Sequence, residues 1–230
     1  MTIANALSVL YSTAPETANI VVMSTEALTR SDQVRRGIWL EYLTIGWNLV
    51  ECGVAVAAGL FAGSVALIGF GFDSAVESIS GSVLLWRLHA ERRGSHTATV
   101  EQRALKLVGI SFLILSAYIA FDSGKTLWRG EHPEHSMVGI VLAVVSLVGM
   151  PLLARAKRNA AHHLSSTALK ADARQTSLCA YLSAILLGGL VLNSLFGWWW
   201  ADPVAALIMV PIIANEGREA LQGKECGCAH

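Results

Sequence analysis

The sequence predicts an all-α, polytopic membrane protein built as a bundle of six transmembrane helices. Two observations support this fold class. Of the 230 residues, 53% are hydrophobic and only 15% are charged, whereas soluble domains usually carry about a quarter charged residues. Long apolar runs also recur along the chain, and a helix needs about 20 such residues to cross a bilayer. The formal net charge is zero, so nothing in the composition favours nucleic acid as a partner.

Six apolar segments of the chain qualify as membrane spans. They cover residues 37–58, 64–86, 105–127, 137–154, 176–196 and 203–216. The Asp202-Pro203 pair is typical of an N-cap followed by proline at the first helical position. Residues 1–34 would form an N-terminal cytoplasmic extension, residues 35–221 the six-helix transmembrane domain, and residues 222–230 a cytoplasmic tail rich in cysteine and histidine.

Positive charge is concentrated in alternate loops. Cations precede the first span and occupy the second–third loop, and the fourth–fifth loop carries Arg155, Lys157, Arg158, Lys170 and Arg174. The remaining loops hold little positive charge. Because cationic loops stay in the cytoplasm, we expect a multi-pass protein of the cell (inner) membrane with both termini in the cytoplasm.

The sharpest functional signal is a pair of carboxylates in the second span. Asp73 and Glu77 are four residues apart, so both lie on one face of a helix, and no other charged residue occurs between positions 64 and 86. An ionisable group at the bilayer centre costs about 2.5–3.5 kcal/mol, so the pair needs a cation, a proton or a buried partner. No lysine or arginine is expected deep in another span, which disfavours a salt bridge. Two oxygen donors one turn apart suit a divalent cation.

Glu51 is a further candidate ligand. It lies in the middle of the first span, with Asn48 three residues earlier on the same face. This carboxylate would share the cation or carry an exchanged proton; a hydrogen-bonded helix contact is the alternative. Glu41, nearer the helix end, is expected at the membrane interface.

Asp172 begins a stripe of polar side chains on the fifth helix. The stripe continues with Thr176, Cys179 and Ser183 at spacings that share one helical face. Asp172 would belong either to an ion pathway or to a helix terminus, where the helix dipole favours a negative charge. For Cys179, a small buried apolar residue is the favoured interpretation.

The C-terminal tail holds two thiols and an imidazole, from Cys226, Cys228 and His230. Such a tail would capture zinc or simply be a disordered end. The sequence contains no His-Glu-x-x-His, Gly-x-Ser-x-Gly or glycine-rich phosphate motif, so we do not expect an enzyme.

Six spans with an Asp-x-x-x-acid pair in the second resemble the cation diffusion facilitator superfamily. The resemblance extends from about Trp47 to Gly223 and includes Gly63-Ser64-Val65-Ala66-Leu67 ahead of the acid pair and Ala201-Asp202-Pro203 at the sixth span. Two stretches look like the short subgroup without a cytoplasmic domain, akin to transmembrane protein 163. They are Met150-Pro151-Leu152-Leu153-Ala154 and Ala171-Asp172-Ala173-Arg174-Gln175-Thr176.

This resemblance implies proton-coupled export of a divalent metal by a homodimer, through alternating access. The family's tetrahedral site combines two acids, or a histidine and an acid, from the second span with a His-x-x-x-Asp pair from the fifth. Here Asp73 and Glu77 supply the first half, Asp172-x-x-x-Thr176 stands at the second, and Glu51 is a candidate for the missing carboxylate. Zinc is the first expected metal, and an oxygen-rich site would also accept manganese, iron(II) or cobalt. No cofactor besides the transported metal is expected.

Two other functions remain open. A non-transporting membrane partner or metal sensor would keep the fold without the ligands of the fifth span. A proton-coupled carrier of small organic solutes would need a larger apolar cavity.

Overall fold

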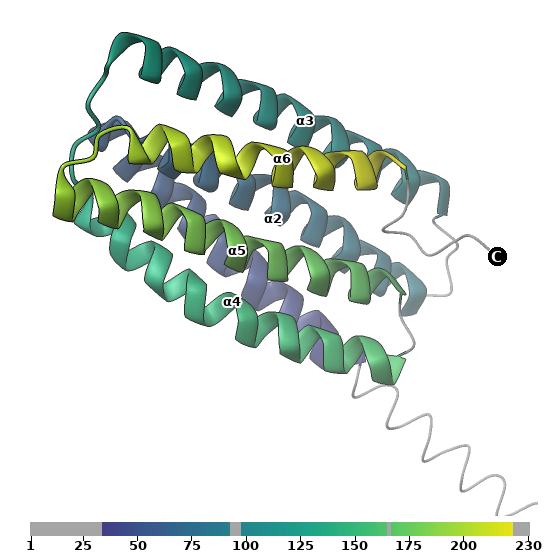
Figure 1. The fold of residues 1–230 in the computed structure, drawn as a ribbon. Helices are drawn as coiled ribbons and strands as arrows, with labels where there is room; N and C mark the ends of the chain where they lie inside the picture. Colours follow the sequence, from purple (N-terminus) through teal and green to yellow (C-terminus); the bar gives the residue numbers. More distant parts are fainter. Residues whose placement is uncertain (1–33, 93–97, 165–166, 223–230) are drawn as a thin grey trace, which may run out of the picture.

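The computed structural model of the protein describes residues 34–92, 98–164 and 167–222, and helices dominate all three ranges (Figure 1). The first helix, drawn in purple, covers Val34–Ala62. It is followed by α2 (Val65–Arg92), α3 (Ala98–Arg129), α4 (Met137–Leu164), α5 (Thr167–Phe196) and α6 (Ala201–Leu221). The described ranges contain no strand. The expected all-α bundle is therefore confirmed.

Several helices are longer than the apolar runs that predict them. α4 continues to Leu164 instead of ending at residue 154, and α5 begins at Thr167 instead of residue 176. Hydropathy marks only the part of a helix that suits lipid, whereas the backbone hydrogen bonds continue through polar residues. This extension decides where the charged side chains of the expected fourth–fifth loop lie.

The two ends of the bundle differ in character. The first helix begins, α4 ends and α5 begins at one end of the bundle, which we call the basic end. This end carries Arg35, Arg36, Arg155, Arg158, Lys170 and Arg174. The other end, which we call the aromatic end, carries Trp128, Trp198, Trp199 and Trp200. Tryptophan is enriched at membrane–water interfaces, so this segregation agrees with helices that cross a bilayer.

Four of the described helices are long and apolar enough to span a membrane: the first helix, residues 106–129 of α3, α4, and residues 172–196 of α5. Their outward faces expose large apolar side chains, as Phe121 on α3 and Val148 on α4 illustrate. α2 and α6 are less apolar than these four helices, because they carry charged residues that are buried in the bundle, among them Asp73, Glu77 and Asp202. The protein is thus a multi-pass membrane protein.

The helices pack in a way that places α2 beside α5. The most extensive contacts join α4 to α5 and α3 to α6, while α2 contacts α3, α5 and α6. The α3–α6 contact is very close, because a Cβ added at Gly109 would lie 2.8 Å from the carbonyl oxygen of Gly217. Small residues allow such close approach between membrane helices.

Asp202 does not cap its own helix, contrary to expectation. α6 begins at Ala201, and its N-cap Trp200 makes no side-chain capping bond. The Asp202 carboxylate instead accepts hydrogen bonds from the Ser64 hydroxyl, at 2.5 Å, and from the backbone N–H of Ala66, at 3.4 Å. It therefore joins the starts of α2 and α6. Sequence spacing cannot reveal this partner, because Ser64 lies 138 residues away.

Candidate functional site

The first helix presents a polar stripe to the interior of the bundle. Glu41, Thr44, Asn48 and Glu51 follow one another at helical spacing, and all four are buried. The opposite face exposes apolar side chains, for example Trp39 and Leu49. A helix that is polar inside and apolar outside fits a lipid-surrounded bundle with an ion pathway at its centre.

Glu51 connects the first helix to three others. Its carboxylate accepts hydrogen bonds from Ser74 on α2, at 2.7 Å, and from Ser146 on α4. The thiol of Cys179 on α5 donates to the same carboxylate at 3.9 Å. Glu51 therefore lies where four helices meet in the middle of the bundle.

Asp73 and Glu77 lie beside this junction and are 3% and 4% exposed. One oxygen of Asp73 and both carboxylate oxygens of Glu77 lack a hydrogen-bond partner among the described residues. Asp73 interacts electrostatically with Glu77 and Glu51, and the thiol of Cys179 lies close enough to all three acids to interact with them. We call these four residues the central cluster.

The central cluster contains donor groups that suit a cation, but these groups do not form a closed set of metal ligands. Buried carboxylates without partners are costly, so they call for a proton or a cation. Carboxylate oxygens suit hard cations, and a thiolate adds affinity for zinc. In the described ranges, however, no group of three or more His, Cys, Asp or Glu side chains has converged into a metal-ligand arrangement. The side chains would have to move together to enclose an ion.

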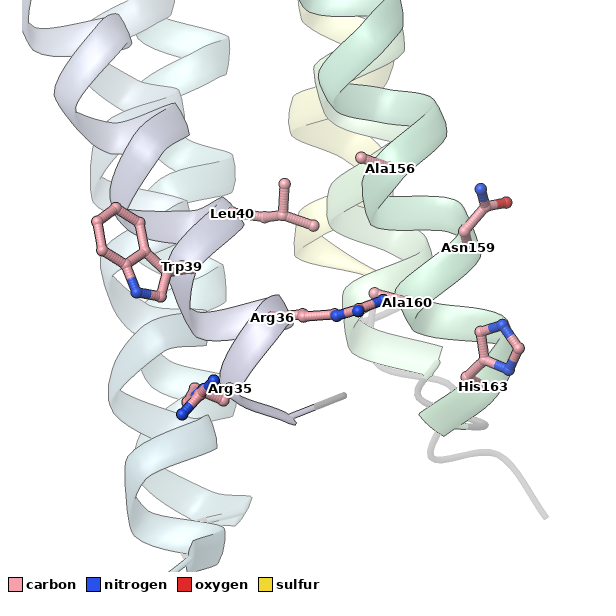
Figure 2. Close-up of a pocket in the computed structure, with 8 residues that line it drawn as sticks. All are labelled: Arg35, Arg36, Trp39, Leu40, Ala156, Asn159, Ala160 and His163. Carbon is pink, nitrogen blue, oxygen red and sulfur yellow. The ribbon is translucent and has the colours of Figure 1, made fainter. Parts of the chain in front are cut away.

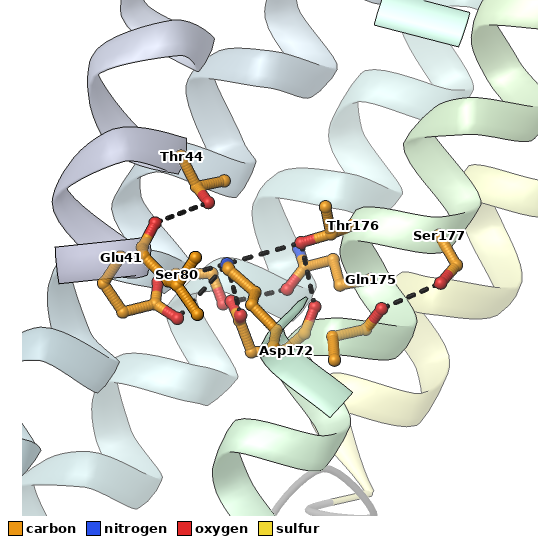
Figure 3. A network of polar contacts seen from close by, with 10 residues as sticks. Glu41, Thr44, Ser80, Asp172, Gln175, Thr176 and Ser177 are labelled. Carbon is orange, nitrogen blue, oxygen red and sulfur yellow. Dashed lines mark hydrogen bonds and ion pairs between the residues drawn. The ribbon is translucent and has the colours of Figure 1, made fainter. Parts of the chain in front are cut away.

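Lys157 corrects the expectation that no cation lies deep in the bundle. Because α4 continues beyond residue 154, this lysine points inward and is fully buried. Its ammonium lies 3.2 Å from Glu41 Oε1 and 2.5 Å from Asp172 Oδ2, and it donates a hydrogen bond to Thr176. Figure 3 labels these three partners, Glu41, Asp172 and Thr176, within the polar network. We call these four residues the Lys157 network.

The Lys157 network changes the interpretation of two acids. Glu41 is fully buried and ion-paired, not interfacial as expected. Asp172 belongs to the expected buried stripe with Thr176, Cys179 and Ser183, but its carboxylate faces the ammonium of Lys157. Glu77 also interacts electrostatically with Lys157. The network therefore lies between the central cluster and the basic end.

Two members of these clusters had weak signals in the sequence. Lys157 follows an apolar run closely, and only its place on the inner face of an extended α4 makes it a buried residue. Cys179 shares the stripe of Asp172, but its neighbour Glu51 is 128 residues away. The tail with Cys226, Cys228 and His230 lies outside the described residues, as does the segment 1–33.

Comparison with known proteins matches residues 42–222 to the cation efflux transmembrane domain. The cation-efflux pump FieF of Shewanella oneidensis is 26% identical over 175 residues, which cover 71% of this chain and 57% of that protein. Transmembrane protein 163 of Xenopus laevis is 24% identical over 188 residues, covering 81% and 66%. A cadmium, cobalt and zinc/H(+)-K(+) antiporter of Bacillus velezensis is 24% identical over 182 residues, covering 75% and 55%. The matched part thus spans between 55% and 66% of these relatives.

Proposed function

The chain belongs to the cation efflux family, and on that premise we propose that it exports a divalent metal, with zinc the first candidate, in exchange for protons. The observation that carries this proposal is the pair of buried carboxylates, Asp73 and Glu77, of which one oxygen of Asp73 and both oxygens of Glu77 lack a hydrogen-bond partner among the described residues. A cation or a proton compensates such charges, and a transport cycle can alternate between the two.

The transported metal would be held between Asp73 and Glu77, with Glu51 and Cys179 completing the donor set. Glu51 already contacts α2, α4 and α5 through hydrogen bonds. A metal bound by its carboxylate would therefore lie among the same helices. Carboxylates and thiols must lose their protons to bind a metal, so binding releases protons. This release supplies the coupling that antiport requires. The name of the Bacillus velezensis relative includes H(+), which supports the same coupling here.

Asp172 takes a different part in this proposal. It enters metal coordination only if its ion pair with Lys157 opens. Its position favours a role on the path between the basic end and the central cluster. Glu41 would share that role, because its carboxylate forms an ion pair with the same Lys157 ammonium.

Orientation and assembly complete the proposal. The cations gathered at the basic end support a cytoplasmic location for that end, with both termini in the cytoplasm of an inner membrane. A homodimer formed through the membrane helices, working by alternating access, is the assembly that we propose.

Transport assays on the full chain in liposomes test this function. Zinc flux under an imposed pH gradient should be lost in Asp73→Asn and in Glu77→Gln. Asp122→Asn is a matched control, because Asp122 lies on α3 outside the central cluster and pairs with Lys125 at 3.6 Å. Flux that persists in both central-cluster variants would refute the proposed site.

A metal sensor or non-transporting partner is the second candidate. The observation that favours it is the absence of a converged ligand group in the described ranges. The same liposome assay separates the two functions. A sensor would bind zinc, as followed by thermal shift, and yet show no flux above that of empty liposomes.

A further inference from the structure

A cavity of about 720 Å³ opens at the basic end, between the first helix and α4 (Figure 2). The first helix contributes Arg35, Arg36, Trp39 and Leu40 to its lining, and α4 contributes Asn159 and His163. The cavity is separate from the central cluster. Arg36 precedes Glu51 by fifteen residues on one helix, which corresponds to roughly 22 Å at 1.5 Å per residue.

The lining of this cavity is positively charged. The described residues that line it include two arginines and a histidine but no acidic side chain. Arg36 extends from the first helix towards α4 (Figure 2). The nearest acid along the helix, Glu41, is fully buried on the inner face, where Lys157 holds it. An anion in the cavity would therefore meet positive charge that no acid among the described lining residues offsets.

Polarity also changes along the lining. The arginines stand at the first turn of a helix that can span a membrane, and Trp39 and Leu40 follow one turn deeper. Trp39 is 69% exposed, as is usual for tryptophan at the level of lipid headgroups. A soluble anion would use only the cationic part, whereas a phospholipid has a phosphate above and acyl chains below. Basic pockets between transmembrane helices bind anionic headgroups in this way.

We propose that this cavity binds the headgroup of an anionic phospholipid, with its phosphate at Arg35 and Arg36 and its acyl chains along Trp39 and Leu40. The lipid would bridge the first helix and α4 on their outer side. The ion pair between Glu41 and Lys157 joins the same two helices on their inner side. Lipid binding would thus stabilise the helix pair that flanks the Lys157 network.

Lipid titration of the purified full chain in detergent tests the proposal. Phosphatidylglycerol is added, with phosphatidylcholine in parallel, and binding is followed by thermal shift and native mass spectrometry. The double variant Arg35→Gln/Arg36→Gln is compared with Arg155→Gln/Arg218→Gln. The control pair removes the same charge from exposed arginines outside the lining.

The native chain and the control pair should bind phosphatidylglycerol in preference to phosphatidylcholine. The Arg35→Gln/Arg36→Gln variant should bind it about thirtyfold more weakly, from the contribution of two arginines near an anionic lipid. Should that variant fail to fold, Arg36→Gln against Arg155→Gln makes the same comparison, with about a fivefold loss.

Three results would overturn the proposal. Equal weakening in the lining and control variants would mean general surface attraction. Equal binding of phosphatidylcholine would mean that the headgroup charge is not recognised. A thermal shift of the same size with inorganic phosphate alone would assign the cavity to a soluble anion instead of a lipid.

Discussion

The ammonium of Lys157 on α4 lies 2.5 Å from Oδ2 of Asp172 on α5, and both side chains are buried. Glu41 shares the same ammonium from the first helix, so two carboxylates compete for one cation. The proposed metal pathway would therefore have a buried positive charge beside it, and Glu77 is near enough to interact with that charge.

Removing this ammonium should destabilise the protein. Lys157→Met would leave Glu41 and Asp172 buried without a cation, and breaking a buried ion pair costs about 3–5 kcal/mol. Thermal unfolding in detergent measures the loss. Lys170→Met is the control, because Lys170 is an exposed lysine on α5. A melting temperature equal to that of the control would contradict the buried ion pair, while partial recovery in Lys157→Met/Asp172→Asn would support it.

Asp172→Asn should separate stability from metal binding. If Asp172 serves Lys157, the variant loses stability, because it removes one of the two described ion pairs of Lys157 and leaves the one with Glu41. Zinc affinity should then fall by less than about threefold, whereas Asp73→Asn should lose at least about tenfold, the equivalent of 1.4 kcal/mol. Calorimetric titration with zinc gives both values. Equal losses in the two variants would make Asp172 a ligand of the same rank as Asp73.

Cys179→Ser should change the metal preference. Replacing a thiol by a hydroxyl removes the soft donor of the central cluster, so zinc affinity should fall relative to manganese affinity. The ratio of the two dissociation constants, measured by competition, reports the effect. Cys52→Ser is the matched control, because Cys52 is a free cysteine on the first helix that belongs to neither cluster. An unchanged ratio in Cys179→Ser would remove the thiol from the proposed donor set.

The sequence predicts the helices and one half of the site. Hydropathy locates the six helices of the described ranges, and the four-residue spacing of Asp73 and Glu77 places both acids on one buried face of α2. The partners of Lys157 and Asp202 are not predictable in this way. A single sequence does not show how an extended helix is rotated, nor which distant side chain fills the space opposite it. Glu41 illustrates the point, because its nearness to a helix end suggests the interface, whereas the structure buries it beside Lys157 of the extended α4.

Proton release on zinc binding would show whether Asp73 and Glu77 hold the metal. The full chain in weakly buffered detergent solution is titrated with zinc while a pH indicator records the protons released. We expect proton release by the native chain and little or none by Asp73→Asn/Glu77→Gln, because a metal held by carboxylates displaces their protons. Release of the same number of protons by that double variant, with unchanged zinc affinity, would contradict a metal site at Asp73 and Glu77.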